Sequence, residues 1–380
     1  MRRLNYLPAL LAAVILTTTP QNSFAFSLSK LLGASSLKSQ DASPDKRNTS
    51  GYGTKKSDAN THSFSDHPWH FQLSGDYLYW KATQEGLSFA LKGCRNVPGT
   101  TIDSTGTDFS PDFSWNSGFK VAASALYNPR WDTTLRYTRY TSNNNQASCS
   151  DPDGNIQEGF ILGTLIASNN FQSQCTFASS NWDLNFNTLD LEVGRHLVNT
   201  YALKMRACAG LKFAYQTQNW NNFFHVNQMY FDQNSDSMGP GKVSSNQQHK
   251  TLGTGIRIGG RADWMIVDHV SLFSSLALSA LWTHYDVSRK DVFTLDSDNI
   301  PVTAVDVRRN SNSSNTIRAI SEFDLGINTF WDLPRNQSLD LSLAYEMQIW
   351  INNSSYIFII NDANSSLSLQ GLNLRVRYGF

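Results

Sequence analysis

The sequence predicts an all-β protein, a transmembrane antiparallel up-and-down β-barrel of about 10 strands, with 12 or more strands as the alternative. Apolar and polar residues alternate with a period of two in ten separate stretches. The connections between these stretches are alternately short and long, and aromatic residues gather at both ends of the stretches. A period of two places successive side chains on opposite faces of a strand. Alternating short turns and long loops are typical of outer-membrane barrels, with short periplasmic turns and long extracellular loops.

The N-terminus carries the features of a secretory signal. Two arginines at positions 2 and 3 precede a short apolar run, residues 7–16, and a polar stretch that closes with small residues around Ala25. The following segment is rich in Ser, Lys, Asp and Asn, as flexible polar segments are. The predicted organisation is a signal peptide (1–25), a flexible polar N-terminal segment (26–66) and a transmembrane β-barrel (67–380).

Composition excludes two other classes of protein. The mean hydropathy of −0.37 is too polar for a helical membrane protein, and no later stretch reaches the ~18 consecutive apolar residues of a spanning helix. Removing the predicted signal takes two arginines and no acids, which leaves 31 − 2 = 29 basic against 31 acidic residues. This near-neutral balance argues against nucleic acid as a partner.

The apolar positions of the ten predicted strands follow one another regularly. The first strand has Phe71, Leu73 and Tyr77 on one face and Gln72 and Asp76 on the other. The fifth is the longest, and in the tenth two arginines alternate with apolar residues up to the final phenylalanine. The apolar faces run over residues 69–79, 119–127, 131–137, 189–197, 201–215, 256–264, 272–282, 317–331, 339–349 and 372–380.

Connections of two lengths separate these strands. Short turns are predicted at 128–130, 198–200, 268–269 and 332–337, and long loops at 82–115, 141–180, 218–249, 286–315 and 352–365. An even strand count brings both ends of the barrel to the short-turn side. Leu87, Phe89 and Leu91 also alternate, so an extra strand in the first long loop is the reason for the alternative of 12 or more.

A secreted β-sandwich would show the same alternation. Strand length and aromatic placement favour the barrel, because soluble strands average ~5–6 residues whereas a tilted membrane strand needs ~9–11. Amphipathic aromatic rings prefer the membrane–water boundary. The predicted membrane-interface aromatics are Trp69, Tyr127, Trp131, Tyr201, Trp264, Trp331 and Tyr378 beside short turns or chain ends, and Trp282 at the opposite ends.

The polar faces of the strands supply candidate pore-lining residues. These are Lys204, Arg206, Lys212, Arg257, Arg261, Glu322, Asp324, Asp340, Glu346, Arg375 and Arg377. The bases of strands five and six and the acids of strands eight and nine predict a transverse field across an aqueous path. The alternative is a closed barrel whose interior is filled by ion pairs, since small barrels are often packed solid. Simple pairing across the turn 198–200 places Glu192 opposite Arg206.

Two stretches carry a family resemblance: "GDYLYWKATQEGLSFA" (75–90) and "SLQGLNLRVRYGF" (368–380). They resemble the Legionella-type major outer membrane protein family of pore-forming barrels, which has relatives in chlamydia-like bacteria. The resemblance implies an integral protein of the Gram-negative outer membrane and a porin-like pore for passive diffusion of small hydrophilic solutes. It also implies that Phe380 is the assembly signal for the barrel-assembly machinery. Outer-membrane lipid, lipopolysaccharide and a possible homo-oligomer are the other expected partners.

The remaining motifs leave alternatives open. Cys94, Cys149, Cys175 and Cys208 allow three pairings, and we favour a disulfide between Cys149 and Cys175 because they share one long loop. The apolar stretch "FILGTLIA" (160–167) in that loop predicts a buried loop core, with a plug or a lipopolysaccharide contact as alternatives. Neither a Cys-x-x-Cys spacing nor a histidine cluster occurs, so we expect no metal and no cofactor.

Two functions from other classes compete with a pore. A non-conducting structural or adhesin barrel would use the Asn- and Ser-rich loops as its surface. A barrel hydrolase would need Asp and His to converge near the long-loop rim. Asp268 and His269 lie on the short-turn side, and His284 and Asp286 have no evident catalytic partner in the sequence. We therefore expect that the protein is not an enzyme.

Overall fold

The structure is a computed structural model, and it describes residues 70–93, 106–128, 130–154, 156–158, 174–230, 237–296, 301–310, 316–334, 337–356 and 363–380. The predicted signal peptide, the polar segment 26–66, Trp69, Cys94 and the apolar stretch 160–167 lie outside these residues.

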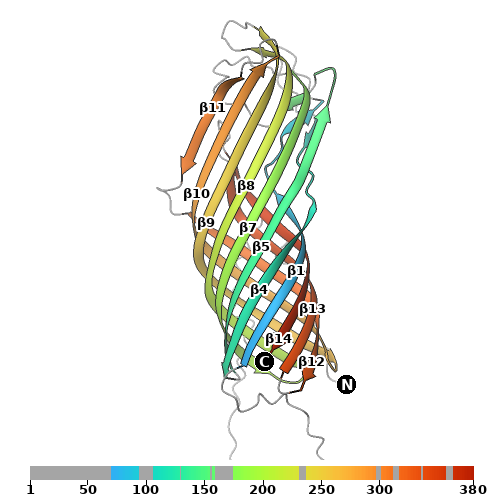
Figure 1. Ribbon diagram of the computed structural model, residues 1–380, viewed down its shortest axis with the longest axis vertical. Helices are drawn as coiled ribbons and strands as arrows, with labels where there is room; N and C mark the ends of the chain where they lie inside the picture. The colour runs from blue at the N-terminus through green and yellow to red at the C-terminus, as the bar shows by residue number, and fades with distance from the viewer. Residues whose placement is uncertain are drawn as a thin grey trace, which may run out of the picture. The chain divides into compact units, whose positions relative to one another are not determined.

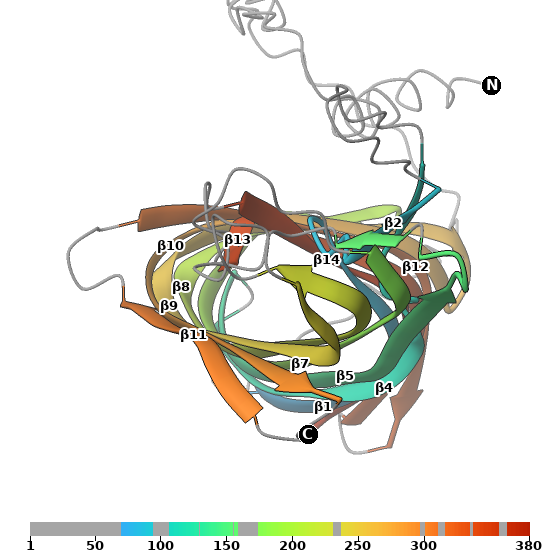
Figure 2. The same ribbon diagram turned by 90° about the horizontal axis from the view of Figure 1, so that it is seen from above.

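Ten long strands form a closed antiparallel barrel, as predicted (Figures 1 and 2). They are β1 (His70–Gln84), β4 (Trp115–Asn128), β5 (Trp131–Ser150), β7 (Gln174–Asn199), β8 (Leu203–Tyr230), β9 (Ser237–Val267), β10 (Val270–Leu295), β12 (Thr316–Leu333), β13 (Gln337–Tyr356) and β14 (Ala363–Gly379). Each strand pairs with the next in this order, and β14 pairs with β1.

Four further strands lie outside this ring. They are β2 (Ala90–Lys92), β3 (Thr107–Phe109), β6 (Ile156–Glu158) and β11 (Pro301–Asn310). The alternating residues around Phe89 form only the three-residue strand β2, which pairs with β3 and β6. β11 pairs with the upper part of β10. The barrel therefore closes with ten strands rather than with 12 or more.

The last residue takes part in closing the barrel. Phe380 N–H donates to the carbonyl oxygen of Phe71 at 2.9 Å, and Phe71 N–H donates to the carbonyl oxygen of Phe380 at 3.1 Å. Their rings stack with centroids 6.3 Å apart. The final aromatic residue thus completes the ladder between the first and last strands.

The lower part of the barrel, next to the short turns, has an apolar outer face. In β8 the exposed positions are Met205, Leu211, Phe213 and Tyr215, and the same parity continues in the neighbouring strands. This apolar band covers residues 203–215 of β8 and 252–266 of β9. No helix in the described ranges is long and apolar enough to span a membrane.

In the upper part of the barrel the outer face becomes polar, and the inner face carries large apolar side chains. Strands β7 to β10 are 26 to 31 residues long, much more than the ~9–11 residues that cross a bilayer, and Figure 1 shows them continuing beyond β12 and β14. In this extension exposed polar residues such as Asn185 and Asn246 face outward. Trp80, Trp182 and Trp220 face inward and are completely buried.

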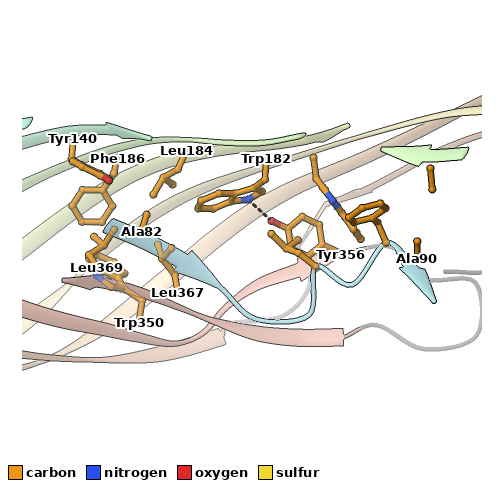
Figure 3. Close-up of a cluster of buried hydrophobic side chains, with 14 of the residues drawn as sticks. Ala82, Ala90, Tyr140, Trp182, Leu184, Phe186, Trp350, Tyr356, Leu367 and Leu369 are labelled. Atoms are coloured by element: carbon orange, nitrogen blue, oxygen red, sulfur yellow. Dashed lines mark hydrogen bonds between the residues drawn. The ribbon is translucent and has the colours of Figure 1, made fainter. Parts of the chain in front are cut away.

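The buried apolar side chains of the extension form one continuous cluster (Figure 3). Trp182 lies at its centre and donates a hydrogen bond from Nε1 to the hydroxyl of Tyr356 at 3.1 Å. Phe186 packs edge-on against Trp350 with ring centroids 5.2 Å apart. Leu367 and Leu369 of β14 lie on the facing wall and are fully buried. We call this cluster the apolar layer. Buried polar side chains such as Gln218, Asn222 and the ion pair of Arg289 with Asp291 lie in the same part of the barrel.

Candidate functional site: the charged lumen

Below the apolar layer the inside of the barrel is lined by charged side chains, which we call the charged lumen. Its residues occupy the inward parity of each strand, so the register of the sheet places them in rows. Asp190 of β7 lies opposite Lys212 of β8, and their side chains meet at 2.8 Å between Oδ1 and Nζ. Both side chains are almost fully buried.

Glu322 of β12 joins two cations from strands that are not its neighbours. Its Oε1 lies 2.7 Å from Lys212 Nζ, and its Oε2 lies 2.5 Å from Arg257 Nη1. Because β9 and β10 separate β8 from β12 in the sheet, the bridge to Lys212 passes through the lumen. Arg257 also donates from Nε to Glu192 at 2.8 Å. Wall residues from four strands are thereby connected in one ionic network.

A second bridge reaches across the strands where the chain closes on itself. Lys120 Nζ of β4 lies 2.5 Å from Glu346 of β13, and β1 and β14 separate these strands. Asn373 donates to Glu346 at 3.0 Å. Arg375 forms a paired contact with Asp76, with Nε and Nη2 at 2.8–3.0 Å from the carboxylate.

The register between β7 and β8 differs from the simple pairing predicted from the sequence. Glu192 lies opposite Gly210, and Arg206 lies opposite His196, because β7 continues to Asn199 and the turn lies at 200–202 rather than at the predicted 198–200. Arg206 instead makes its shortest contact with Asp132 of β5, at 2.5 Å, and reaches Glu192 only at 3.4 Å. The predicted ion pair therefore exists, but as a diagonal contact.

Little free space remains between these side chains. A cavity of about 60 Å³ lies in the charged lumen, and its walls include Arg136, Cys208, Arg257 and Glu322. Since about one probe sphere of ~10–15 Å³ suffices for a water molecule, the cavity has room for a few waters. Its lining is predominantly polar.

All eleven predicted pore-lining residues lie on the inward parity of the strands. Lys212, Arg257, Glu322 and Glu346 meet in the cross-lumen bridges, whereas Arg261 pairs with its neighbour Asp263 at 2.7 Å. Near the short-turn end, Arg377 lies 3.6 Å from Asp340, and Lys204 lies 5.7 Å from the ring centroid of Phe330. Asp324 accepts from the Ser275 hydroxyl at 2.7 Å.

The prediction of a transverse field, with basic and acidic residues in separate sectors of the wall, is wrong in the described conformation. Three acids pair with bases of β8 and β9: Asp132 with Arg206, Asp190 with Lys212 and Glu192 with Arg257. Glu322 of β12 also pairs with Arg257. The predicted list of pore-lining residues did not include these three acids or Asp76, although Asp76, Asp190 and Glu192 have the inward parity in the sequence and Glu192 was expected to pair with Arg206. Mixed pairs therefore replace separate positive and negative sectors.

The predicted interface aromatics flank the apolar band. At the short-turn end Trp131, Trp264 and Trp331 are 39–44% exposed, and Tyr201 is 64% exposed. Tyr127 and Tyr378 are half-buried there. Trp282 lies on the outer face at the other end and is 49% exposed.

The cysteines and the hydrolase candidates do not form sites. Cys149 and Cys175 are not joined by a disulfide in the structure, so the predicted bridge is not formed. The register aligns Cys149 with Ala178, three residues along β7 from Cys175, which is too far for a disulfide. Tyr201 donates a hydrogen bond to Asp268 at the short-turn side. Across the described ranges, no group of three His, Cys, Asp or Glu residues could hold a metal ion.

Comparison with known proteins gives the family. The family model described as the Legionella pneumophila major outer membrane protein precursor matches residues 64–380, a range that includes the entire described barrel. The chain belongs to this family. A search of curated proteins found no match.

Several solved structures of outer-membrane barrels are similar to this family member at low identity. The outer membrane protease OmpT from Escherichia coli is 11% identical, with 82% of this chain and 97% of that chain covered and a TM-score of 0.37. A major outer membrane protein from Thermus thermophilus is 12% identical, with 83% and 100% covered and a TM-score of 0.31. A Pseudomonas aeruginosa FadL homologue is 10% identical, with 82% and 90% covered and a TM-score of 0.28.

Family and fold together place this major outer membrane protein in the bacterial outer membrane. The apolar band is then its lipid-facing surface, and the segments within the band are its membrane-spanning segments. The extension of β7 to β10 lies on the long-loop side, which in such barrels faces the exterior.

Proposed function

We propose that this major outer membrane protein is a porin-like pore for small hydrophilic solutes, closed in the conformation described here. One contrast supports the proposal: the lumen is charged and holds a polar cavity between the aromatic belts, whereas above them a continuous cluster of buried apolar side chains fills part of the interior. A charged, hydrated wall suits polar solutes, because it can replace part of their hydration shell.

Stability alone gives no reason for the charged lumen. Burying ion pairs costs desolvation, and replacing them by apolar side chains of similar volume is often neutral or stabilising. This chain fills the same barrel with Leu184 and Phe186 only a few residues above Asp190 on the same strand and face. The ion pairs are therefore better explained by passage of polar solutes than by packing.

In this proposal the side chains of the apolar layer block the path of a solute through the barrel. Trp182 and Tyr356 meet inside it, held by their hydrogen bond of 3.1 Å. Tyr356 also donates to Gln218 of β8 at 2.5 Å. Opening requires these side chains to separate, and the cross-lumen bridges below them must also rearrange.

Replacing Trp182 with alanine is expected to raise the open fraction about a hundredfold. Removing a buried Trp costs about 3–5 kcal/mol in a core. Only part of this loss destabilises the closed state relative to the open one, and about every 1.4 kcal/mol changes an equilibrium tenfold. Single-channel recording of the purified full chain in planar bilayers measures the open fraction directly.

The matched control is Trp282→Ala, which removes the same side chain from the lipid-facing surface. It should leave the open fraction unchanged. Conductance in neither the wild type nor Trp182→Ala would contradict the pore and support the second candidate, a non-conducting barrel that displays its extension. The continuous core of that extension is the observation that favours this candidate.

Several partners accompany the pore proposal. We propose that Phe380, at the closing ladder, is the signal for the barrel-assembly machinery, and that the outer face contacts outer-membrane lipid and lipopolysaccharide. A homo-oligomer stays a prediction. We also propose that the protein is not an enzyme. Asp268 has a structural partner in Tyr201, and exposed His284 lies on the outer face of β10 beside Trp282.

A further inference from the structure

One arginine inside the barrel lacks the carboxylate that the other buried arginines have. Arg318 of β12 is 4% exposed, and its guanidinium lies over the ring of Tyr285 at 5.4 Å. In the part of the chain that the structure describes, no carboxylate pairs with it, and its Nε and Nη1 make no hydrogen bond. Burying an unpaired charge is strongly unfavourable, so a compensating group is expected nearby.

Two buried amides of β8, Gln216 and Gln218, present further donors in the same part of the barrel. Gln218 Oε1 accepts from the Tyr356 hydroxyl at 2.5 Å, and Tyr356 in turn accepts from Trp182. These bonds fix the orientation of the Gln218 amide. Gln216 Oε1 accepts from Asn353 at 2.7 Å. Both Nε2 groups are left without a hydrogen-bond partner among the described residues, and both side chains are at most 1% exposed.

A neutral histidine completes the cluster. His249 lies above the membrane-spanning part of β9, and its burial and the positive charge of Arg318 lower its pKa to about 3. Thr251 lies 3.2 Å from Nδ1, and when it donates there the ring proton sits on Nε2. Nε2 has no partner within the described ranges. The His249 and Tyr285 rings are nearly parallel, with centroids 6.0 Å apart.

The sheet register brings these groups together from four adjacent strands. Thr251 of β9 lies opposite Gln216 of β8 and Tyr285 of β10, and His249 lies opposite Gln218. Arg318 of β12 lies opposite Leu281, the inward neighbour of the interface residue Trp282. The cluster therefore lies inside the barrel at the boundary between the charged lumen and the apolar layer.

We propose that Arg318, Gln216, Gln218 and His249 form a binding site for a small monovalent anion, either chloride or the carboxylate of a small solute. The cluster offers one uncompensated positive charge and several N–H donors. A bound anion would satisfy both, whereas a cation or a neutral apolar group would satisfy neither. The site follows from the barrel interior alone and holds whether or not the barrel conducts.

The test is the thermal unfolding of the full chain in lipid vesicles. Sodium chloride, sodium acetate and sodium isethionate are compared at equal ionic strength. A ligand that binds only the folded state raises the unfolding midpoint with its concentration. We expect the midpoint to rise with chloride, acetate or both, and which of them acts identifies the ligand. The larger isethionate is expected to have no such effect.

Variants distinguish the site from general salt effects. Arg318→Gln is expected to abolish the dependence on chloride and acetate, and Arg377→Gln, at the short-turn mouth, to retain it. Gln218→Leu removes one donor and should weaken the apparent affinity about five- to tenfold, which covers the case in which Arg318→Gln does not fold. Two results would overturn the proposal: an unfolding midpoint of the wild type that does not change with chloride or acetate, or a dependence of the midpoint on these anions that persists in Arg318→Gln.

A crystal grown in bromide supplies the second readout. We expect an anomalous peak beside Arg318 and the two glutamines if halide binds, and its loss when acetate replaces bromide. If both the stability series and the anomalous map show no anion at this position, the donors are satisfied by water only and the site does not exist.

Discussion

Replacing Gly210 with alanine is expected to keep most of the protein from reaching the closed barrel. Gly210 lies on the inner wall of β8, and a Cβ there would overlap the carbonyl oxygen of Leu191 and come within 2.8 Å of Glu192 Cα. Both are backbone atoms of β7, so the clash is relieved only by separating the two strands. We expect a loss of about 3 kcal/mol or more in the free energy of unfolding.

The measurement is the fraction of heat-modifiable, folded protein after refolding into vesicles, followed by urea unfolding. Gly75→Ala is the matched control, because a Cβ at Gly75 meets no atom within 4 Å. Its effect should stay within about 0.5 kcal/mol. Equal folded fractions for the two variants would contradict the close approach of β7 and β8.

Replacing Glu322 with glutamine is expected to destabilise the barrel by about 3 kcal/mol. The change removes the carboxylate that joins Lys212 and Arg257 across the lumen. Breaking a buried pair leaves an uncompensated charge, which typically costs about 3–5 kcal/mol. We expect the lower end, because each cation keeps a second carboxylate in Asp190 or Glu192.

Urea unfolding in vesicles, monitored by tryptophan fluorescence, measures this loss. Asp340→Asn is the control, because Asp340 pairs with Arg377 at the mouth, where both side chains are partly exposed and 3.6 Å apart. Exposed pairs contribute at most about 1 kcal/mol. If Glu322→Gln costs no more than Asp340→Asn, the bridge across the lumen does not exist as described.

The strands and their inward faces could be predicted from the sequence because both depend on local alternation. Parity alone was enough to assign Lys212 and Glu322 to the inner wall. Their contact was not predicted, because it depends on the stagger of strands three positions apart. Glu192 and Arg206 show the same limit within one hairpin, since the turn lies at 200–202 rather than at the predicted 198–200.

The apolar layer was missed although its signal is present in the sequence. Leu78 and Trp80 continue the face of Asp76, and Leu184 and Phe186 continue the face of Asp190, so the period is kept while the polarity changes. The prediction of loops above the upper aromatic belt was wrong for the parts of 141–180, 218–249 and 286–315 that the structure describes as strand, among them Trp220 and Val243. Such long strands instead need an inner core of their own, because no lipid covers their outer face.

The exchange of polarity between the two parts of the barrel is the central claim, and spin labels along β8 test it most directly. Single labels at successive positions from 205 to 224, with the native cysteines replaced by serine, report accessibility to oxygen and to a water-soluble nickel chelate. We expect oxygen access at odd positions from 205 to 215 and chelate access at odd positions from 217 to 223. Even positions from 214 to 224 should exclude both reagents. Chelate access at those even positions would show a water-filled interior and contradict the apolar layer.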